Sequence, residues 1–407
     1  MSSVPQNLEP FDRKKSRVSL AENGPCSVVD NGDDTKPNPY GWNSQANLVY
    51  VDQPAGTGFS YSDQSGYDHN ETQVAEDMFH FFQAFYDRHP EYLPNGLFIV
   101  GESYGGHYAP AVSHRVYVGN KKGEGKHHIP LKGVAVGNGL TDPLVQYKYY
   151  PELAYNYSIS KLGHPIVSES TYSGMVASWP KCQKMISQCQ QDTSECSKAQ
   201  SYCNDAMISP YEQTGHNPYD IRKMCNYQPL CYNMQPVTNF LTNQTVVKKL
   251  GTEGHKWSVC NFEVNSQFSN DWMKNFQQDL APMLEDGIPV LIYAGDVDFI
   301  CNWLGNKAWT LDLDWSGKSA FNNAGDNSWK VKGEAAGEVR SAKGLTFLRV
   351  YNAGHVSYTL MLCVIDIPFS IDIFCINYSL VLQMVPQDQP QAALQMINTL
   401  ITQSPWQ

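Results

Sequence analysis

Short apolar runs bounded by turn residues recur along the chain and predict the strands of a parallel sheet. The runs cover residues 47–52, 97–100, 134–137, 288–293 and 345–350. They lack the regular apolar–polar alternation of a half-exposed strand, which is typical of strands covered on both faces. Residues 72–88 are predicted to form a helix, because apolar side chains recur there on one face at Val74, Met78, Phe81, Phe82 and Phe85. Strand, helix and strand joined by short links form a βαβ unit, so we expect an α/β fold with a mostly parallel central sheet and helices on both faces.

The strand–helix alternation stops in the middle of the chain, which predicts three parts. Residues 1–146 are expected to form the first part of the α/β core and residues 147–265 a cap inserted into it. Residues 266–407 are then the second part of the core, resuming with a helix predicted at residues 272–284. Residues 1–45 are rich in Ser, Pro, Asn, Asp and Gly and are predicted to be loop.

Length and charge narrow the class of protein. A chain of 407 residues can bury a large core, and α/β enzymes of this length often form one domain with an inserted cap. The formal net charge of −11 argues against a nucleic-acid or anionic-membrane partner. Charged residues make up 17% and hydrophobic ones 42%, which is an ordinary globular balance.

Cysteines are concentrated in the predicted cap. Seven of the 11 lie there, and six of these fall within one polar stretch, at Cys182, Cys189, Cys196, Cys203, Cys225 and Cys231. A metal site is the alternative, but the spacings are mostly seven rather than CxxC and no His pairs accompany them. We therefore expect a disulfide-stapled insertion in an oxidising compartment. Asn-x-Ser/Thr acceptors for glycosylation fit that compartment, among them Asn70, Asn156 and Asn243.

The start of the chain conflicts with an oxidising compartment. Residues 1–15 are polar and contain neither the basic nor the apolar region of an export signal. Because a disulfide-rich protein needs export, we expect the sequence to be truncated at its N-terminus.

The sharpest local signal for chemistry is a G-x-S-x-G motif at residues 101–105, directly after the strand predicted at 97–100 and before a helix predicted at 107–117. In that context a tight turn lifts Ser103 to the edge of the sheet. The backbone N–H of Tyr104 then points at a developing oxyanion, helped by the helix N-terminus. The alternative is a glycine-rich turn without chemistry.

A serine nucleophile needs a histidine base held by an acid, and in this architecture they follow the serine in the order acid, then histidine. Asp296 and Asp298 lie in the loop after the predicted strand 288–293, and Gly354-His355 follows the last predicted strand. The remaining histidines lack that context and are expected to be surface or packing residues: His69, His80, His89, His107, His114, His127 and His128.

Taken together, these sites resemble the serine carboxypeptidase family, in particular its vacuolar carboxypeptidase Y-like branch. The segments that carry the resemblance are GESYGGHYAP (101–110), WNSQANLVYVDQPAGTGFSYS (42–62), GNGLTDP (137–143), LIYAGDVDFICNWLGNKAW (291–309) and RVYNAGH (349–355). The resemblance runs from about residue 22 to the C-terminus. It implies an α/β-hydrolase fold and a vacuolar, lysosomal or secreted enzyme without a cofactor or metal.

The resemblance also implies roles for individual residues. Ser103 becomes the nucleophile, Asp298 the acid, with Asp296 as the alternative, and His355 the base. Glu102 and Glu22 look like the two glutamates that bind the terminal carboxylate of a peptide. A carboxyl group donates a hydrogen bond to a carboxylate only while protonated, so we expect removal of C-terminal residues from peptides and proteins at acidic pH.

For the cysteines the resemblance implies a definite pairing. Cys182 pairs with Cys203, Cys189 with Cys196 and Cys225 with Cys231, whereas spacing alone leaves all pairings of six cysteines open. Cys301 corresponds to a buried free thiol near the active site.

Two departures from the family pattern stand out. The first is the absence from residues 1–19 of the family segment WLNGGPGCSS, which supplies the second oxyanion N–H and a cysteine partner for the position of Cys260. Cys26 is an alternative partner for Cys260. Removing one oxyanion donor costs about 10²–10³ in turnover.

The second departure is an atypical insertion of 28 residues, 356–383, between His355 and the sequence Met384-Val385-Pro386. We hypothesise that it is a retained in-frame intron, which amplification of the transcript across the junction would test. A membrane helix is disfavoured, because Asp366, Pro368 and Asp372 lie in mid-span. If translated, the segment is expected to be a disordered or poorly packed loop that disturbs His355.

Three function classes therefore remain open at this stage. The first is a serine carboxypeptidase that acts on peptides with a free C-terminus, without nucleic-acid or membrane partners. The second is a catalytically impaired family member that acts as a binding scaffold. The third is an α/β-hydrolase esterase, against which Glu102 and Glu22 argue, because an ester gives two carboxyl groups nothing to bind.

Overall fold

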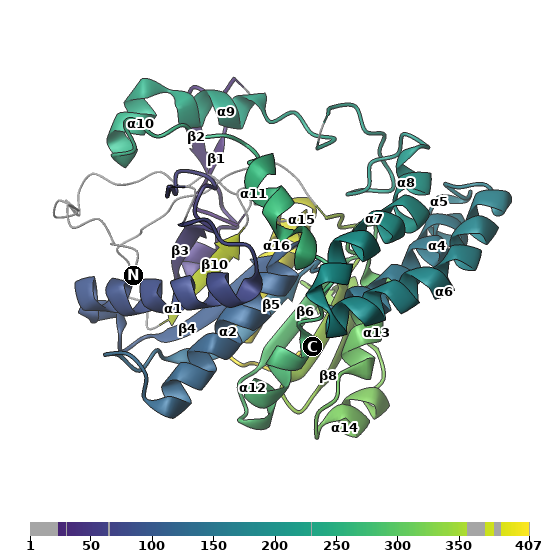
Figure 1. Cartoon of the computed structure of the whole chain (residues 1–407). Coiled ribbons are helices and arrows are strands. Elements are labelled where there is room, and N and C mark those ends of the chain that lie inside the picture. Colours follow the sequence, from purple (N-terminus) through teal and green to yellow (C-terminus); the bar gives the residue numbers. More distant parts are fainter. Residues whose placement is uncertain are drawn as a thin grey trace.

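A computed structural model describes residues 23–29, 31–63, 66–228, 230–355, 371–377 and 384–406. Its centre is an eight-stranded sheet in the order β3-β10-β4-β5-β6-β9-β8-β7 (Figure 1). The strands are β3 (Asn47–Asp52), β4 (Gly96–Glu102), β5 (Leu131–Gly137), β6 (Val290–Gly295), β7 (Asn327–Val331), β8 (Glu334–Ala342), β9 (Leu345–Val350) and β10 (Ile371–Asn377). The pairs from β3 to β9 are parallel, whereas the β9–β8 and β8–β7 pairs at one edge are antiparallel, so β8 runs against the other strands of this sheet. The five predicted strands and the mostly parallel sheet are confirmed.

Helices cover both faces of this sheet. The helices of the core are α1 (Glu71–Arg88), α2 (Gly105–Lys122), α12 (Ala281–Glu285), α13 (Trp303–Asp312), α14 (Lys318–Asn323), α15 (Met384–Asp388) and α16 (Pro390–Ile401). Alternate residues of β4 point to opposite faces, as the two-residue period of a strand requires. Leu97 and Ile99 pack in one buried cluster with α1 and α2, and Phe98 and Val100 in another with α16.

The region predicted to be a cap is helical, and its helices form two groups in different parts of the molecule. Between residues 143 and 267 the helices are α3 (Pro143–Gln146), α4 (Tyr150–Glu152), α5 (Ser158–Leu162), α6 (Glu169–Gln191), α7 (Cys196–Met207), α8 (Ser209–Glu212), α9 (Gln235–Thr242), α10 (Gln244–Leu250) and α11 (Phe262–Gln267). Figure 1 shows α4–α8 together at one end of the molecule, whereas α9 and α10 lie beside β1 (Cys26–Val28) and β2 (Thr35–Pro37).

Disulfides staple the cap with the pairing that the family resemblance implies. Cys182–Cys203 and Cys189–Cys196 join α6 to α7, and Cys225–Cys231 closes a short loop. Cys26, Cys260 and Cys301 carry free thiols, so Cys26 does not pair with Cys260. Within the described ranges no group of side chains could hold a metal ion, and no helix combines the length and apolarity that a membrane crossing requires.

Two expectations about local structure are wrong. Residues 26–28 and 35–37, expected to be loop, form the β1–β2 hairpin. In the helix predicted at 272–284, residues 272–276 are not helical, and regular structure begins only at Gln277. The reason is tertiary: the N–H of Phe276 donates to Thr141 O at 2.9 Å, and the ring of Trp272 packs on Tyr104.

The expectation of a loop within residues 356–383 is also wrong for residues 371–377. These form β10, which pairs with β3 on one side and with β4 on the other, so that Phe374 lies level with Val49 and Ile99. The expectation that this segment disturbs His355 fails as well, because His355 keeps close contacts with both Ser103 and Asp298. The remaining residues of the segment lie outside the described ranges.

Candidate active site

Ser103 lies at the sharp turn between β4 and α2. Its φ is 58°, a left-handed conformation that is uncommon for a residue other than glycine. The turn also brings the strand and helix so close that side chains cannot fit at the neighbouring glycines. A Cβ on Gly101 would lie 2.6 Å from Gly105 O, and one on Gly106 would lie 2.5 Å from Leu140 O. The G-x-S-x-G context therefore has the predicted geometry of a strand, a strained serine and a helix.

The backbone of Ser103 is held by the turn after β5. The Ser103 N–H donates to Gly137 O at 3.1 Å, and the Leu140 N–H donates to Ser103 O at 2.9 Å. Tyr104 is the N-cap residue of α2, so its amide lies at the positive end of the helix beside the serine. This places the Tyr104 N–H where an oxyanion donor is expected.

His355 connects Ser103 to Asp298. The distance from Nε2 to Ser103 Oγ is 2.8 Å, and that from Nδ1 to Asp298 Oδ2 is 2.7 Å. His355 is 1% exposed and Asp298 is fully buried, so bulk water does not compete for these contacts. Because a carboxylate only accepts, Nδ1–H donates to Asp298, and Nε2 of the neutral ring is left to accept the serine proton.

The geometry distinguishes the roles of Asp296 and Asp298, which lie in the loop after β6 that we call the acid loop. Asp296 is buried as well, but its carboxylate contacts Lys161 Nζ at 2.8 Å and Arg349 Nη2 at 3.3 Å. It also accepts the N–H of Asn352 at 2.7 Å. Asp296 is thus neutralised by two cations, whereas Asp298 faces the imidazole.

Asp298 has two further donors. The Asn138 amide donates from Nδ2 to Asp298 Oδ2 at 2.7 Å, and the Cys301 N–H lies 3.3 Å from each carboxylate oxygen. Sequence reasoning did not assign a role to Asn138. The signal was present, because the polar segment GNGLTDP follows a buried strand and the carboxyl ends of parallel strands share one edge of the sheet.

Residues 217–222 of the cap, which we call the strap, contact both the acid loop and His355. The strap backbone bonds to the acid loop, with Ile221 N–H donating to Val297 O at 2.9 Å and Phe299 N–H to Pro218 O at 3.1 Å. It also accepts the His355 N–H at Tyr219 O at 2.7 Å. The ring of Tyr219 stacks on the imidazole with centroids 5.4 Å apart. No motif indicated Tyr219, since the contact exists only once the cap folds over the core.

Two other predicted site residues lie beside the acid. Glu102 ends β4 and is 4% exposed, and Cys301 is buried with a free thiol. Burial, with the nearby carboxyls of Asp298 and Glu102, raises the pKa of the Cys301 thiol well above its usual value. The thiol therefore stays protonated and unreactive. Glu22 lies outside the described residues.

His107 in α2, expected to be a surface or packing residue, packs in the core. His107 is fully buried and its ring stacks on Tyr104 with centroids 4.5 Å apart. Burial lowers the pKa of His107 to about 4, so the ring is neutral.

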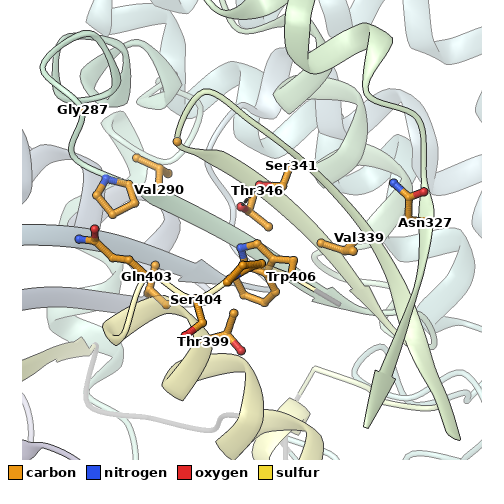
Figure 2. Close-up of a pocket in the computed structure, with 14 residues that line it drawn as sticks. Gly287, Val290, Asn327, Val339, Ser341, Thr346, Thr399, Gln403, Ser404 and Trp406 are labelled. Carbon is orange, nitrogen blue, oxygen red and sulfur yellow. Dashed lines mark hydrogen bonds between the residues drawn. The ribbon is translucent and has the colours of Figure 1, made fainter. Parts of the chain in front are cut away.

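A cavity of about 570 Å³ lies away from Ser103, at the end of the sheet where β6 and β9 begin (Figure 2). It is lined by Val290 at the start of β6, Thr346 near the start of β9 and Trp406 in the C-terminal tail. Asp298 follows the other end of β6, and a strand of that length separates them by about 16 Å. The cavity is therefore separate from the site around Ser103.

Comparisons with known proteins show the family of this chain. Residues 17–360 match the family model "Serine carboxypeptidase". Carboxypeptidase Y of Candida albicans is 41% identical over 389 residues, which cover 94% of this chain and 64% of that protein. Serine carboxypeptidase 3 of Hordeum vulgare is 38% identical over 379 residues, which cover 92% of this chain and 67% of that protein. The chain thus spans about two thirds of the length of these relatives.

Among solved structures, Kex1(delta)p, a prohormone-processing carboxypeptidase from Saccharomyces cerevisiae, matches with a TM-score of 0.74. The match covers 94% of this chain and 79% of that one at 24% sequence identity, and it shows the α/β-hydrolase fold. On the family match and the identity to these relatives, the chain belongs to the serine carboxypeptidase family.

Proposed function

We propose that this protein is a serine-type carboxypeptidase that hydrolyses the last peptide bond of peptides and proteins. The proposal rests on the contacts of His355, which joins Ser103 Oγ through Nε2 to Asp298 through Nδ1. Ser103 itself lies in the strained turn between β4 and α2. Three separate loops of the chain supply these side chains, so their convergence is a property of the folded site.

In the proposed reaction Ser103 Oγ attacks the carbonyl carbon of the last peptide bond, and its proton passes to His355 Nε2. Asp298 stabilises the imidazolium that forms, and the Tyr104 N–H donates to the developing oxyanion. When the C–N bond breaks, His355 returns the proton to the leaving amino group. A water molecule then attacks the acyl-serine ester by the same route, and Ser103 is regenerated.

Selection of a chain end is proposed to depend on Glu102. Its carboxyl is 4% exposed, and a neutral carboxyl in such a place can donate a hydrogen bond to a substrate carboxylate. Glu22 is proposed as its partner in this role. Because ionisation of these groups would place negative charges opposite the substrate's own, activity is expected to be highest at acidic pH.

Two rival functions make different demands on the site. An esterase has no use for a buried carboxyl beside the nucleophile, and comparing a peptide with a free C-terminus against its C-terminal amide separates the two activities. A scaffold without catalysis needs no hydrogen-bonded serine. The three disulfides support a vacuolar, lysosomal or secreted location, because disulfides persist in oxidising compartments.

The test is labelling by a fluorophosphonate at pH 5, followed by peptide hydrolysis. We expect labelling of the parent, none of Ser103→Ala, and a loss of about 10⁴ in turnover for Asp298→Asn. Ser113→Ala is the matched control, because Ser113 is a buried serine in α2 outside the contact path and its replacement should leave labelling intact. A folded parent that does not label would favour the scaffold.

A further inference from the structure

The turn after β5 contacts both the nucleophile and the acid. Gly137 O accepts the N–H of Ser103, and the Leu140 N–H donates to the carbonyl of Ser103. Between them Asn138 extends its amide to Asp298. One four-residue turn therefore sets the position of two groups of the proposed triad, which lie 195 residues apart in the chain.

The orientation of the Asn138 amide follows from its contacts. The side chain is fully buried, and Gly295 N–H donates to its Oδ1 at 3.2 Å. Since a backbone N–H cannot accept, the atom facing it must be the oxygen, and the Nδ2 group must face Asp298. The backbone is anchored as well, because the Asn138 N–H donates to Tyr293 O at 2.8 Å.

The backbone at this position also favours asparagine. Its φ of 42° lies in the left-handed region, which asparagine, aspartate and glycine adopt more easily than other residues. Aspartate at this place would bring a second carboxyl to Asp298, and glycine would bring no donor. Among the residues suited to this backbone, asparagine alone supplies a neutral N–H to the acid.

The chemistry of the contact concerns the charge on Asp298. Its Oδ2 receives the 2.7 Å contacts from both Asn138 and His355, whereas the Cys301 N–H lies at the longer distance of 3.3 Å. A hydrogen bond to a buried carboxylate favours its ionised form and fixes its orientation. Because a side-chain amide does not titrate, the Asn138 donor is present at every pH.

We propose that Asn138 is a positioning residue that holds the Asp298 carboxylate in line with His355. The inference rests on the proposed function, since it assigns to Asn138 a role in the same triad. Asn138 acts through Asp298 and has no assigned contact with substrate, so its loss should lower kcat and leave KM nearly unchanged.

The experiment measures the rate of fluorophosphonate labelling between pH 4 and pH 8, which avoids any contribution from recognition of a substrate carboxylate. Asn138→Gly removes the amide and retains the left-handed backbone. We expect its labelling to fall about 10–100-fold across this pH range, because the Asp298 carboxylate is no longer held in line with His355.

Asn138→Asp should show a pH dependence that Asn138→Gly lacks. At acidic pH the introduced carboxyl is protonated and can donate to Asp298, so labelling should stay near that of the parent. As the pH rises the proton is lost and the two carboxylates repel each other, so labelling should fall. Lys343→Gly is the control, since it places glycine at another left-handed position (φ 53°) far from the site and should leave the profile unchanged.

The outcomes separate the two proposals. If the parent labels and Ser103→Ala does not, the proposed function stands. No loss in Asn138→Gly, or an equal loss at every pH in Asn138→Asp, would then overturn the role of Asn138. If the folded parent does not label at any pH, the function and the role of Asn138 fail together. Thermal unfolding of each variant shows that the measured protein is folded.

Discussion

The strand that carries Ser103 lies between two unlike neighbours. β5 was evident from the sequence, pairs with β4 and β6, and ends in the turn that contacts both Ser103 and Asp298. β10 was expected to be loop, comes from the insertion after His355, and joins β4 to β3. The two strands are level with each other, because Val134 of β5 and Phe374 of β10 both lie opposite Ile99.

This difference shows that a place in a sheet can be occupied by residues from remote parts of the chain. β3 and β4 are consecutive strands of the βαβ unit, yet each pairs with β10 and they lie two strand spacings apart, about 9.6 Å. Without β10 the facing backbone groups of β3 and β4 would lose their partners in the core of the sheet. β10 is therefore as necessary to the sheet as β5.

The most severe test of this comparison is to remove β10. Joining His355 directly to Met384 deletes residues 356–383, and we expect the product to lose cooperative folding, because about a dozen ladder groups would be left unpaired at about 1–3 kcal/mol each. Circular dichroism and thermal unfolding of the purified protein measure the effect. A deletion protein that unfolds as cooperatively as the parent would show that β10 is dispensable and would support the retained-intron hypothesis.

A finer test replaces one residue in each neighbour of β4. Both residues lie level with Ile99; Val134→Pro removes the N–H that donates to Pro289 O at 3.0 Å, and Phe374→Pro removes one backbone N–H of β10. We expect both to lower the free energy of unfolding by about 1–3 kcal/mol or more, by similar amounts. Denaturant unfolding measures this. A large loss for Val134→Pro with none for Phe374→Pro would mean that β10 does not contribute to the sheet in solution.

Two buried acid sites of the molecule differ in a similar way. Asp298 faces N–H groups. Glu71 begins α1, the helix that connects β3 to β4, and its carboxyl faces that of Asp271. Burial, and then the charge of Asp271, raise the pKa of Glu71 well above its usual value, and burial raises the pKa of Asp271 to about 7. Two carboxyls in contact share a proton, so a lower pH should stabilise this contact.

The smallest expected effect follows from that pair. Raised pKa values mean that these two groups bind more protons in the folded protein than in the unfolded chain. The stability that the pair contributes should therefore be fully present below about pH 4 and be lost as the pH rises through about 7. Glu71→Gln supplies an N–H to Asp271 and should reduce this loss by about 1–2 kcal/mol. Denaturant unfolding at pH 4, 5.5 and 7.5 measures it.

The exposed Glu334→Gln is the matched control for this measurement. It should reproduce the pH dependence of the parent. An equally steep loss in Glu71→Gln would contradict a shared proton between Glu71 and Asp271.

Sequence reasoning succeeded where local pattern and structure agree. The runs at 47–52 and 345–350 became β3 and β9 with the same bounds, and the helix predicted at 72–88 became α1. It failed where distant contacts decide. Residues 373–376 are an apolar run much like 97–100. They were nevertheless expected to be loop, because the insertion departs from the family pattern. Nothing in the local sequence indicates that β4, about 270 residues earlier, needs a partner strand.

By itself the sequence determined the elbow, the order of serine, aspartate and histidine, and the parallel strands, because turn chemistry and apolar periodicity act over a few residues. Only the tertiary structure decided that β10 separates β3 from β4, that the strap carries Tyr219 onto His355, and that Asn138 reaches Asp298. These depend on which strand ends meet at one edge of the sheet. That choice is made by the packing of the whole chain, which no short segment encodes.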